Sequence, residues 1–139
     1  MKYTTIECDQ RSEEWFAARA GRLTGSVAAD MATKIKSGAW SASRKNLRMK
    51  LALERITARP HESPYISAAM QRGIDLEAAA LARYEAESGL ILERPGFLAA
   101  DELMVGCSLD ALIPGQGIVE AKCPESATHL EYLRTRQIP

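Results

Sequence analysis

The chain of 139 residues has few of the residue types that hold structural metals or covalent cross-links. Its three cysteines, Cys8, Cys107 and Cys123, are an odd number without a Cys-x-x-Cys spacing, which argues against both a disulfide framework and a zinc site. Its two histidines, His61 and His129, are too far apart in the sequence to be paired ligands, and we expect both at the surface. These absences disfavour zinc proteins and disulfide-rich secreted scaffolds.

The chain also lacks a long apolar run, a signal-peptide pattern, a low-complexity tract and an internal repeat. A membrane-spanning helix would need about 20 consecutive apolar residues. With 46% hydrophobic residues, a chain of this length can bury one core. We therefore expect a single domain over residues 1–139, in a cytoplasmic protein that does not associate with membranes.

The formal net charge is zero, but the charges are unevenly distributed. Residues 1–60 contain 12 Lys and Arg against 6 Asp and Glu, whereas residues 61–139 contain 6 against 12. A basic stretch in the first half suits the phosphates of a duplex, and the acidic half suits metal ions. The alternative for the basic stretch is a solvated helix face, with Leu47, Leu51 and Ile56 on its buried side. The basic residues concerned are Arg44, Lys45, Arg48, Lys50, Arg55 and Arg59.

The most informative pattern begins shortly before a Pro-Gly-Gln-Gly stretch that opens at Pro114. This stretch separates two apolar runs and predicts a β-hairpin that places Asp110 across from Glu120 and Ala121. Because side chains alternate along a strand, Glu120 and Lys122 share a face. Two carboxylates and an ammonium then converge, which suits Mg²⁺ beside a phosphate and a lysine that positions an activated water. The alternative is an exposed hairpin with solvated Glu and Lys neighbours.

A second group of candidate residues lies near the N-terminus, where a helix is expected to end before Gly21. Thr24 and Ser26 then open a short second helix. Their hydroxyls, the free backbone N–H groups and the guanidinium of Arg19 could face one anion, such as a terminal phosphate. The alternative is that Ser26 is an ordinary helix cap and Trp15 is a core residue.

Helices are expected to precede a run of strands, which indicates an α+β fold with a mixed sheet. The helix over residues 67–88 would bury Ile74, Leu81 and Tyr84, with Glu77 beside that stripe. A buried carboxylate needs a partner, either a metal or a basic residue such as Arg72 or Arg83. The remaining expected helices cover residues 12–20, 26–34, 43–58 and 125–136, and the expected strands cover residues 89–93, 96–100, 103–112 and 117–122.

Four motifs are most specific when they are taken together, in their order and spacing. They are Trp15 to Arg19 to Ser26, Gly73-Ile74-Asp75-Leu76-Glu77, Cys107-Ser108-Leu109-Asp110, and Glu120-Ala121-Lys122-Cys123-Pro124. In this arrangement the chain resembles the YqaJ-type viral recombinase or phage lambda exonuclease family, within the PD-(D/E)xK nucleases. The resemblance implies a restriction-endonuclease-like α+β core, with N-terminal helices followed by a mixed sheet and a flanking C-terminal helix.

The resemblance also implies a Mg²⁺-dependent exonuclease, with Mn²⁺ as a substitute, that degrades one strand of duplex DNA from a 5′ end. It implies one group of residues for metal binding and catalysis, and another for the 5′-terminal phosphate. The first group is Asp110, Glu120 and Glu77 as metal ligands with Lys122 as the catalytic lysine, and the second is Arg19, Ser26 and Thr24.

The family resemblance extends to partners and to the length of the chain. Members leave 3′-ended single strands for a single-strand annealing protein, form ring-shaped trimers and are encoded by phages or prophages in bacterial cells. They also continue beyond this chain with a further helix and at least one more strand, so we expect a C-terminally truncated member. Two other functions are open: a PD-(D/E)xK endonuclease, and a non-catalytic protein that binds DNA ends.

Overall fold

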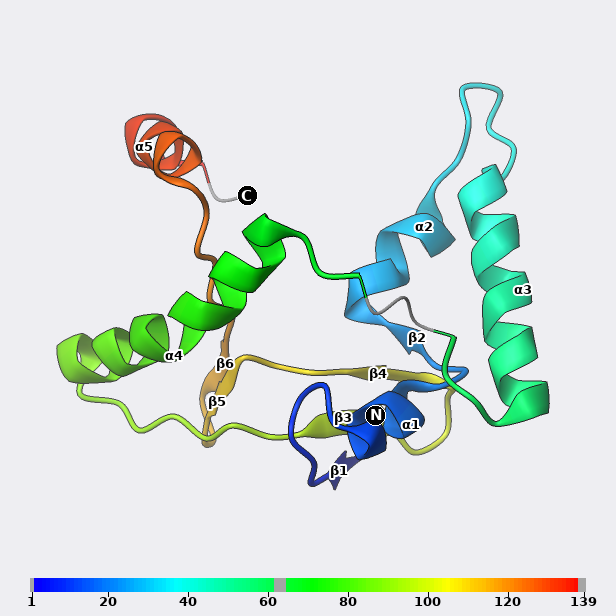
Figure 1. The fold of residues 1–139 in the computed structure, drawn as a ribbon, viewed down its shortest axis with the longest axis horizontal. Helices are drawn as coiled ribbons and strands as arrows, with labels where there is room; N and C mark the ends of the chain where they lie inside the picture. Colours follow the sequence, from blue (N-terminus) through cyan, green and yellow to red (C-terminus); the bar gives the residue numbers. More distant parts are fainter. Residues whose placement is uncertain (1, 62–64, 138–139) are drawn as a thin grey trace. The chain divides into compact units, whose positions relative to one another are not determined.

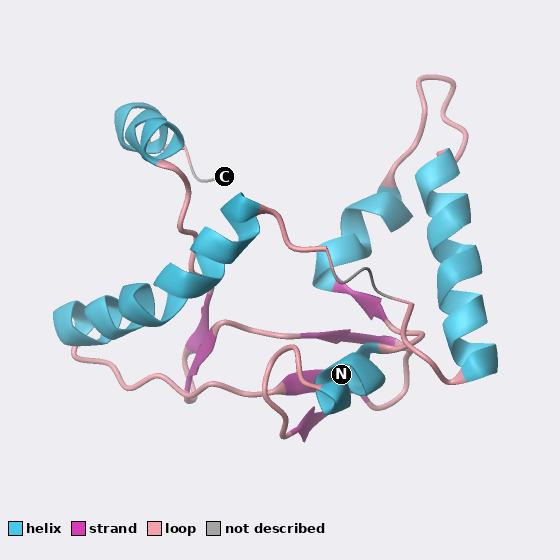
Figure 2. Ribbon diagram, in the orientation of Figure 1, coloured by secondary structure: helices cyan, strands magenta, loops and turns pink. Residues whose placement is uncertain are grey.

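The computed structural model describes residues 2–61 and 65–137 as helices, short strands and connecting loops (Figures 1 and 2). They form two compact units, one made of residues 1–63 and 95–109 and the other of residues 64–94 and 110–139. The elements confirm the predicted α+β class. In the described part of the chain, no helix is long and apolar enough to cross a membrane.

The first unit contains a mixed four-stranded sheet in the order β1-β3-β4-β2. Strand β1 (Tyr3–Ile6) pairs antiparallel with β3 (Phe97–Ala100), and β3 pairs antiparallel with β4 (Val105–Cys107). The short β2 (Leu23–Thr24) lies parallel to β4. The sheet therefore joins the beginning of the chain to segments that follow much later in the sequence.

The core of the first unit forms where helix α1 (Glu13–Arg19) meets the sheet. Ser12 begins this helix because its hydroxyl accepts a hydrogen bond from the N–H of Trp15 at 3.2 Å. The indole of Trp15 packs against Phe97, which is fully buried. A Cβ atom at Gly106 would lie 2.3 Å from the Phe97 ring, so only glycine lets β4 pass this close.

The first unit has further helices, and its longest described helix is α3 (Ala42–Thr57). Leu47 and Leu51 are buried on this helix, as predicted, whereas the prediction that Ile56 is buried is wrong, because its side chain is 83% exposed. The preceding segment forms a 3₁₀ turn η1 (Gly25–Val27) and the short helix α2 (Ala28–Ala32).

The second unit consists of helix α4 (Ala68–Ser88), a two-stranded hairpin and helix α5 (Ser126–Thr135). The hairpin is β5 (Ala111–Ile113) and β6 (Gly117–Val119), with Gly115 at a φ of +69° in its turn. This confirms the predicted turn, because only a residue that tolerates positive φ closes it readily.

Helix α4 has the predicted ends, since Ser67 caps its first turn and Gly89 follows its last in the left-handed conformation. Leu81 is its buried residue, at 1% exposure. Ile74 is partly buried, but Tyr84 is 39% exposed, so the predicted inward face is narrower than expected.

Several predicted boundaries are wrong. The strand expected over residues 89–93 is a single bridge between Glu93 and Leu112, and the one expected over residues 103–112 is divided between β4 and β5, which belong to different sheets. Strands β1 and β2 were not predicted. The helix expected over residues 26–34 is shorter, because its first residues form the 3₁₀ turn and Thr33 is already extended.

Candidate active site and phosphate-binding site

The hairpin of the second unit places Asp110 and Glu120 at its open end. Ala111 pairs with Val119, so the residues just outside this pair, Asp110 and Glu120, lie opposite each other as predicted. The N–H of Ala121 donates to Oδ2 of Asp110 at 2.7 Å. Because this N–H binds a carboxylate and not a strand carbonyl, the ladder ends at Val119 and not at residue 122 as predicted.

Lys122 lies beside Glu120 and forms an ion pair and a hydrogen bond with Oε1 of that carboxylate. This hydrogen bond raises the pKa of Lys122 above its ordinary value, and the negative charges of Asp110 and Glu77 raise it further. Burial opposes these effects. Lys122 is therefore a charged ammonium at neutral pH, held among carboxylates.

The carboxyl group of Asp110 has a pKa above its ordinary value. Burial is the largest cause and the charge of Glu120 adds to it, whereas the Ala121 N–H and the charge of Lys122 lower it. A carboxylate that is costly to ionise in the free protein gains from a bound cation, which offsets both the desolvation and the repulsion from Glu120.

Glu77 lies on α4 and is half-buried. Its charge is close enough to Lys122 to raise the pKa of that ammonium, so the helix carboxylate faces the same group as the hairpin carboxylates. The basic residues considered as its partners have other contacts: Arg83 pairs with Glu87, and Arg72 donates to the carbonyl of Pro124 at 3.4 Å.

In residues 2–61 and 65–137, no three His, Cys, Asp or Glu side chains are grouped closely enough to hold a metal ion by themselves. The oxygen donors of Asp110 and Glu120 nevertheless fit a hard cation, since Mg²⁺ in enzymes commonly uses one or two carboxylates, several waters and a substrate phosphate. The hairpin thus offers a two-carboxylate site that a substrate phosphate and waters would complete.

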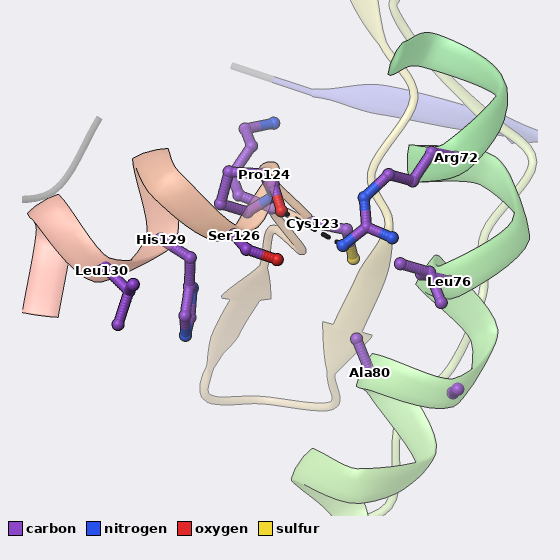
Figure 3. Close-up of a pocket in the computed structure, with 10 residues that line it drawn as sticks. Arg72, Leu76, Ala80, Cys123, Pro124, Ser126, His129 and Leu130 are labelled. Carbon is purple, nitrogen blue, oxygen red and sulfur yellow. Dashed lines mark hydrogen bonds between the residues drawn. The ribbon is translucent and has the colours of Figure 1, made fainter. Parts of the chain in front are cut away.

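A cavity of about 610 Å³ lies between α4 and the segment that leads into α5 (Figure 3). Lys122 contributes to its lining, so the cavity adjoins the candidate catalytic group. Arg72 reaches across from α4 toward Pro124, with Leu76 and Ala80 forming an apolar wall (Figure 3). His129, which was expected at the surface, is exposed and lines the other side.

In the first unit, the structure brings Arg19, Thr24 and Ser26 together as predicted. One guanidinium nitrogen of Arg19 donates to the hydroxyl of Ser26 at 3.3 Å and to that of Thr24 at 3.5 Å, and the two hydroxyls are 3.1 Å apart. Ser26 lies within the 3₁₀ turn, so it is not the cap of helix α2. A guanidinium and two hydroxyls in this arrangement suit a phosphate.

Trp15 positions Arg19. The guanidinium carbon of Arg19 lies 4.0 Å from the centre of the indole ring, a cation–π contact, and the indole Nε1–H donates to the hydroxyl of Ser108 at 2.7 Å. Ser108 therefore adds a third hydroxyl linked to this group. Ser108 belongs to one of the four sequence motifs, but its role could not be predicted because its partner lies 93 positions earlier in the chain.

Two residues of α3 hold the turn that follows Arg19. The buried carboxylate of Glu54 accepts from the N–H of Gly21 at 2.7 Å, and Nε of Arg55 donates to the Gly21 carbonyl at 2.7 Å. Gly21 has a φ of +71°, and a Cβ there would lie 2.6 Å from the Arg55 side chain. Arg55, a candidate phosphate contact in the sequence, therefore has a structural partner.

The four sequence motifs, in their order along an α+β fold, define the class of the protein. The chain belongs to the family of the YqaJ-like viral recombinase domain, which matches residues 14–139. Two solved structures of one relative are similar to it: an alkaline exonuclease (LHK-Exo) from Laribacter hongkongensis, and LHK-Exo in complex with dAMP. Their TM-scores are 0.75 and 0.76, each at 40% sequence identity.

The alignment covers 91% of this chain but 61% of LHK-Exo, so the chain spans less than two thirds of that relative. No protein of curated function matches the chain in sequence. The comparisons confirm the family and the fold that the sequence predicted, and they relate the chain to a nuclease.

Proposed function

We propose that the chain forms the nuclease part of a metal-dependent exonuclease that degrades one strand of duplex DNA from its 5′ end. The observation that carries the proposal is the meeting of Asp110, Glu120 and Lys122 at the open end of one hairpin. The relationship to an alkaline exonuclease supports a nuclease. The direction of digestion, the duplex DNA substrate and the activity of this chain are our proposal and go beyond that relationship.

Asp110 and Glu120 would hold Mg²⁺, or Mn²⁺ in its place, and Glu77 on α4, which is not grouped with them closely enough to bind the same ion directly, would act through a metal-bound water. The bound metal would supply a nucleophilic hydroxide at neutral pH and offset charge on the phosphate. The raised pKa of Asp110 fits this assignment, because a cation offsets the cost of a partly buried charge.

Lys122 would orient the attacking water and stabilise the charge that develops on the phosphate oxygens. Water adds to phosphorus while the bond from phosphorus to the leaving O3′ breaks, and the leaving oxygen takes up a proton. The products are a 5′-mononucleotide and a strand with a new 5′-phosphate. The charge network around Lys122 keeps its ammonium protonated for this task.

Arg19, Thr24 and Ser26 would bind the 5′-terminal phosphate. Each cut produces the same end group again, so one phosphate-binding site can serve every cycle. The cation–π contact with Trp15 fixes Arg19 in place before DNA binds, which reduces the entropy lost on binding.

The cavity that adjoins Lys122 would receive the excised nucleotide. Its apolar wall suits a base or sugar, and Arg72 with His129 supplies polar groups. The binding of dAMP by LHK-Exo is consistent with a nucleotide site in a protein of this family. We further propose 3′-ended single strands as the product, a single-strand annealing protein as partner, a ring-shaped oligomer and action in the bacterial cytoplasm.

The test is digestion of a 5′-phosphorylated linear duplex, labelled at either end of either strand, with Mg²⁺ or EDTA. A closed circular duplex serves as the matched substrate without ends. We expect Mg²⁺-dependent loss from 5′ ends and an intact circle. Cleavage of the circle would indicate an endonuclease, and DNA binding without any digestion would indicate a non-catalytic protein that binds ends.

A further inference from the structure

The positive charge of the first unit is concentrated around α3. Between Asp30 and Glu54 the sequence contains six basic residues and no acidic one. Ordinary solvated surfaces interleave both signs of charge, whereas a run of one sign attracts a polyanion. The six residues are Lys34, Lys36, Arg44, Lys45, Arg48 and Lys50.

The structure divides the basic residues of α3 into two groups. Arg55 binds a backbone carbonyl and Lys50 lies 3.8 Å from the buried carboxylate of Glu54, so both have roles in the fold. Lys45 and Arg48 are exposed, and no ion pair among the described residues includes either of them. Their charges are therefore available to a partner.

Trp40 organises the cations at the beginning of the helix. The guanidinium carbon of Arg44 lies 3.4 Å from the centre of its ring, and the ammonium of Lys34 lies 4.8 Å from it. Arg44 also donates to the carbonyl of Met31 at 3.0 Å. Half of the Trp40 surface stays exposed, at 53%, so the aromatic residue supports the cations without being part of the core.

A surface hollow of about 700 Å³ lies against these residues and is lined by Trp40, Arg44, Lys45, Arg48, Met49 and Ala52. Lys45 and Arg48 are three residues apart on α3, which separates them by about 4.5 Å along the helix axis. Each strand of a DNA duplex carries one phosphate per about 3.4 Å of its axis, so two such cations can reach neighbouring phosphates.

We propose that this hollow binds the sugar–phosphate backbone of a DNA duplex, and this inference rests on the proposed nuclease function. Lys45 and Arg48 contact the phosphates, and Trp40 holds Arg44 in place beside them. Phosphate contacts carry no sequence information, so we expect this surface to bind without sequence preference. This contact is separate from the Arg19 group, which binds a terminal phosphate.

An acidic protein surface would also be attracted by these cations. A DNA duplex fits better because its phosphates repeat at the short interval set by the double helix. In addition, the segment between Asp30 and Glu54 contains no acidic residue that could pair with basic residues at the rim of a protein interface. We therefore assign the surface to DNA, and the experiment below distinguishes DNA from a protein partner.

The double variant Lys45→Gln/Arg48→Gln tests the inference in the full chain. Its affinity for a short labelled duplex is measured by fluorescence anisotropy in EDTA over a range of KCl concentrations. We expect weaker binding, and a plot of log affinity against log salt whose slope is smaller by about two, one for each lost phosphate contact. The matched control Arg83→Gln/Arg134→Gln removes two exposed cations of the second unit and should bind as the wild type does.

Thermal unfolding of each variant checks that its fold is intact. An unchanged salt slope in the double variant, with normal wild-type binding and digestion, would overturn this inference and leave the nuclease proposal standing. A wild type that neither binds nor digests DNA would overturn both. Loss of self-association or of binding to an acidic protein, with the DNA slope unchanged, would assign the surface to a protein partner and also overturn the inference.

Discussion

Lys122 is the residue whose removal should separate chemistry from binding. We expect Lys122→Ala to reduce the rate of cleavage by about a hundredfold or more, because its ammonium acts on the water and the transition state. Affinity for DNA ends should change little. Single-turnover digestion in Mg²⁺ and anisotropy in EDTA measure the two effects. Lys45→Ala is the control, and it should cleave at the wild-type rate when the DNA is saturated with protein.

Cleavage by Lys122→Ala at the wild-type rate would contradict the catalytic assignment. Rescue by Lys122→Arg would indicate that positive charge, and not a proton from the lysine, is what the reaction requires.

Arg19 should determine the preference for phosphorylated ends. We expect Arg19→Ala to lose most of the preference for 5′-phosphate over 5′-hydroxyl ends, because the hydroxyls of Thr24 and Ser26 cannot supply the missing charge. The measurement is the ratio of initial digestion rates on the two substrates. Arg22→Ala is the matched control, since Arg22 contacts only the carbonyl of Leu103 among the described hydrogen bonds.

If the wild type and Arg19→Ala both digest 5′-phosphate and 5′-hydroxyl ends at equal rates, the assignment of the phosphate-binding site is wrong. A preference that is lost equally in Arg22→Ala would indicate a general effect of charge.

The candidate site residues could be predicted where their positions depend on local structure such as a turn. The turn around Gly115 fixes the hairpin register, and the register places Asp110 opposite Glu120. Ser108 and Glu54 could not be assigned roles, because their partners, Trp15 and Gly21, lie far away in the sequence. No local pattern indicates such a contact.

At the level of elements, the turn that follows α1 depends on contacts with α3. Glu54 on α3 accepts from the N–H groups of both Gly21 and His61, at 2.7 and 2.8 Å. We expect Glu54→Ala to lower the free energy of unfolding by about 2 kcal/mol or more, because two N–H groups lose their partner in a largely buried position. Urea unfolding measures this change.

Glu87→Ala is the control for this prediction. Glu87 forms an exposed ion pair with Arg83, so its loss should cost roughly 0.5 kcal/mol or less. Equal stability of Glu54→Ala and wild type would show that the turn after Arg19 is held by other contacts.

The helices were easier to predict than the strands. The ends of α4 follow from the cap at Ser67 and the glycine at Gly89, which act within one turn. Strands β1 and β2 depend on pairing with residues about 80 to 100 positions away and have no comparable local signal. The segment over residues 103–112 reads as one strand in the sequence because the change of sheet between β4 and β5 leaves its apolar pattern unbroken.

For the whole molecule, the clearest expectation concerns stability in the presence of metal. We expect Mg²⁺ to raise the Tm of the wild type over its value in EDTA, because an ion that binds only the folded state stabilises it. Asp110→Asn should lose this rise. In EDTA the variant should be at least as stable as the wild type, since burial and Glu120 make the Asp110 charge unfavourable in the free protein.

Differential scanning fluorimetry in Mg²⁺ and in EDTA measures both effects, and Asp75→Asn on the exposed side of α4 is the control. If Mg²⁺ raises the Tm of Asp110→Asn as much as it raises the Tm of the wild type, the metal binds elsewhere. This readout needs no DNA and no cleavage.

The charge asymmetry of the whole chain could be read from the sequence, and the structure assigns it to particular residues. Lys45 and Arg48, which are exposed and in no ion pair among the described residues, lie on α3, and the carboxylates that surround Lys122 lie on α4 and the hairpin. The division into two units could not be predicted, because residues 95–109 join the first unit through strand pairing and side-chain contacts with residues far earlier in the sequence.

The positions of the two tryptophans have an experimental consequence. Trp15 lies under Arg19 and Trp40 under Arg44, and the sequence contains no other indole. Any change in the tryptophan fluorescence of this protein therefore comes from the neighbourhood of these two guanidinium groups. Single Trp→Phe variants would give each proposed DNA contact its own optical signal without a dye, and would allow end capture and backbone binding to be followed in time as separate events.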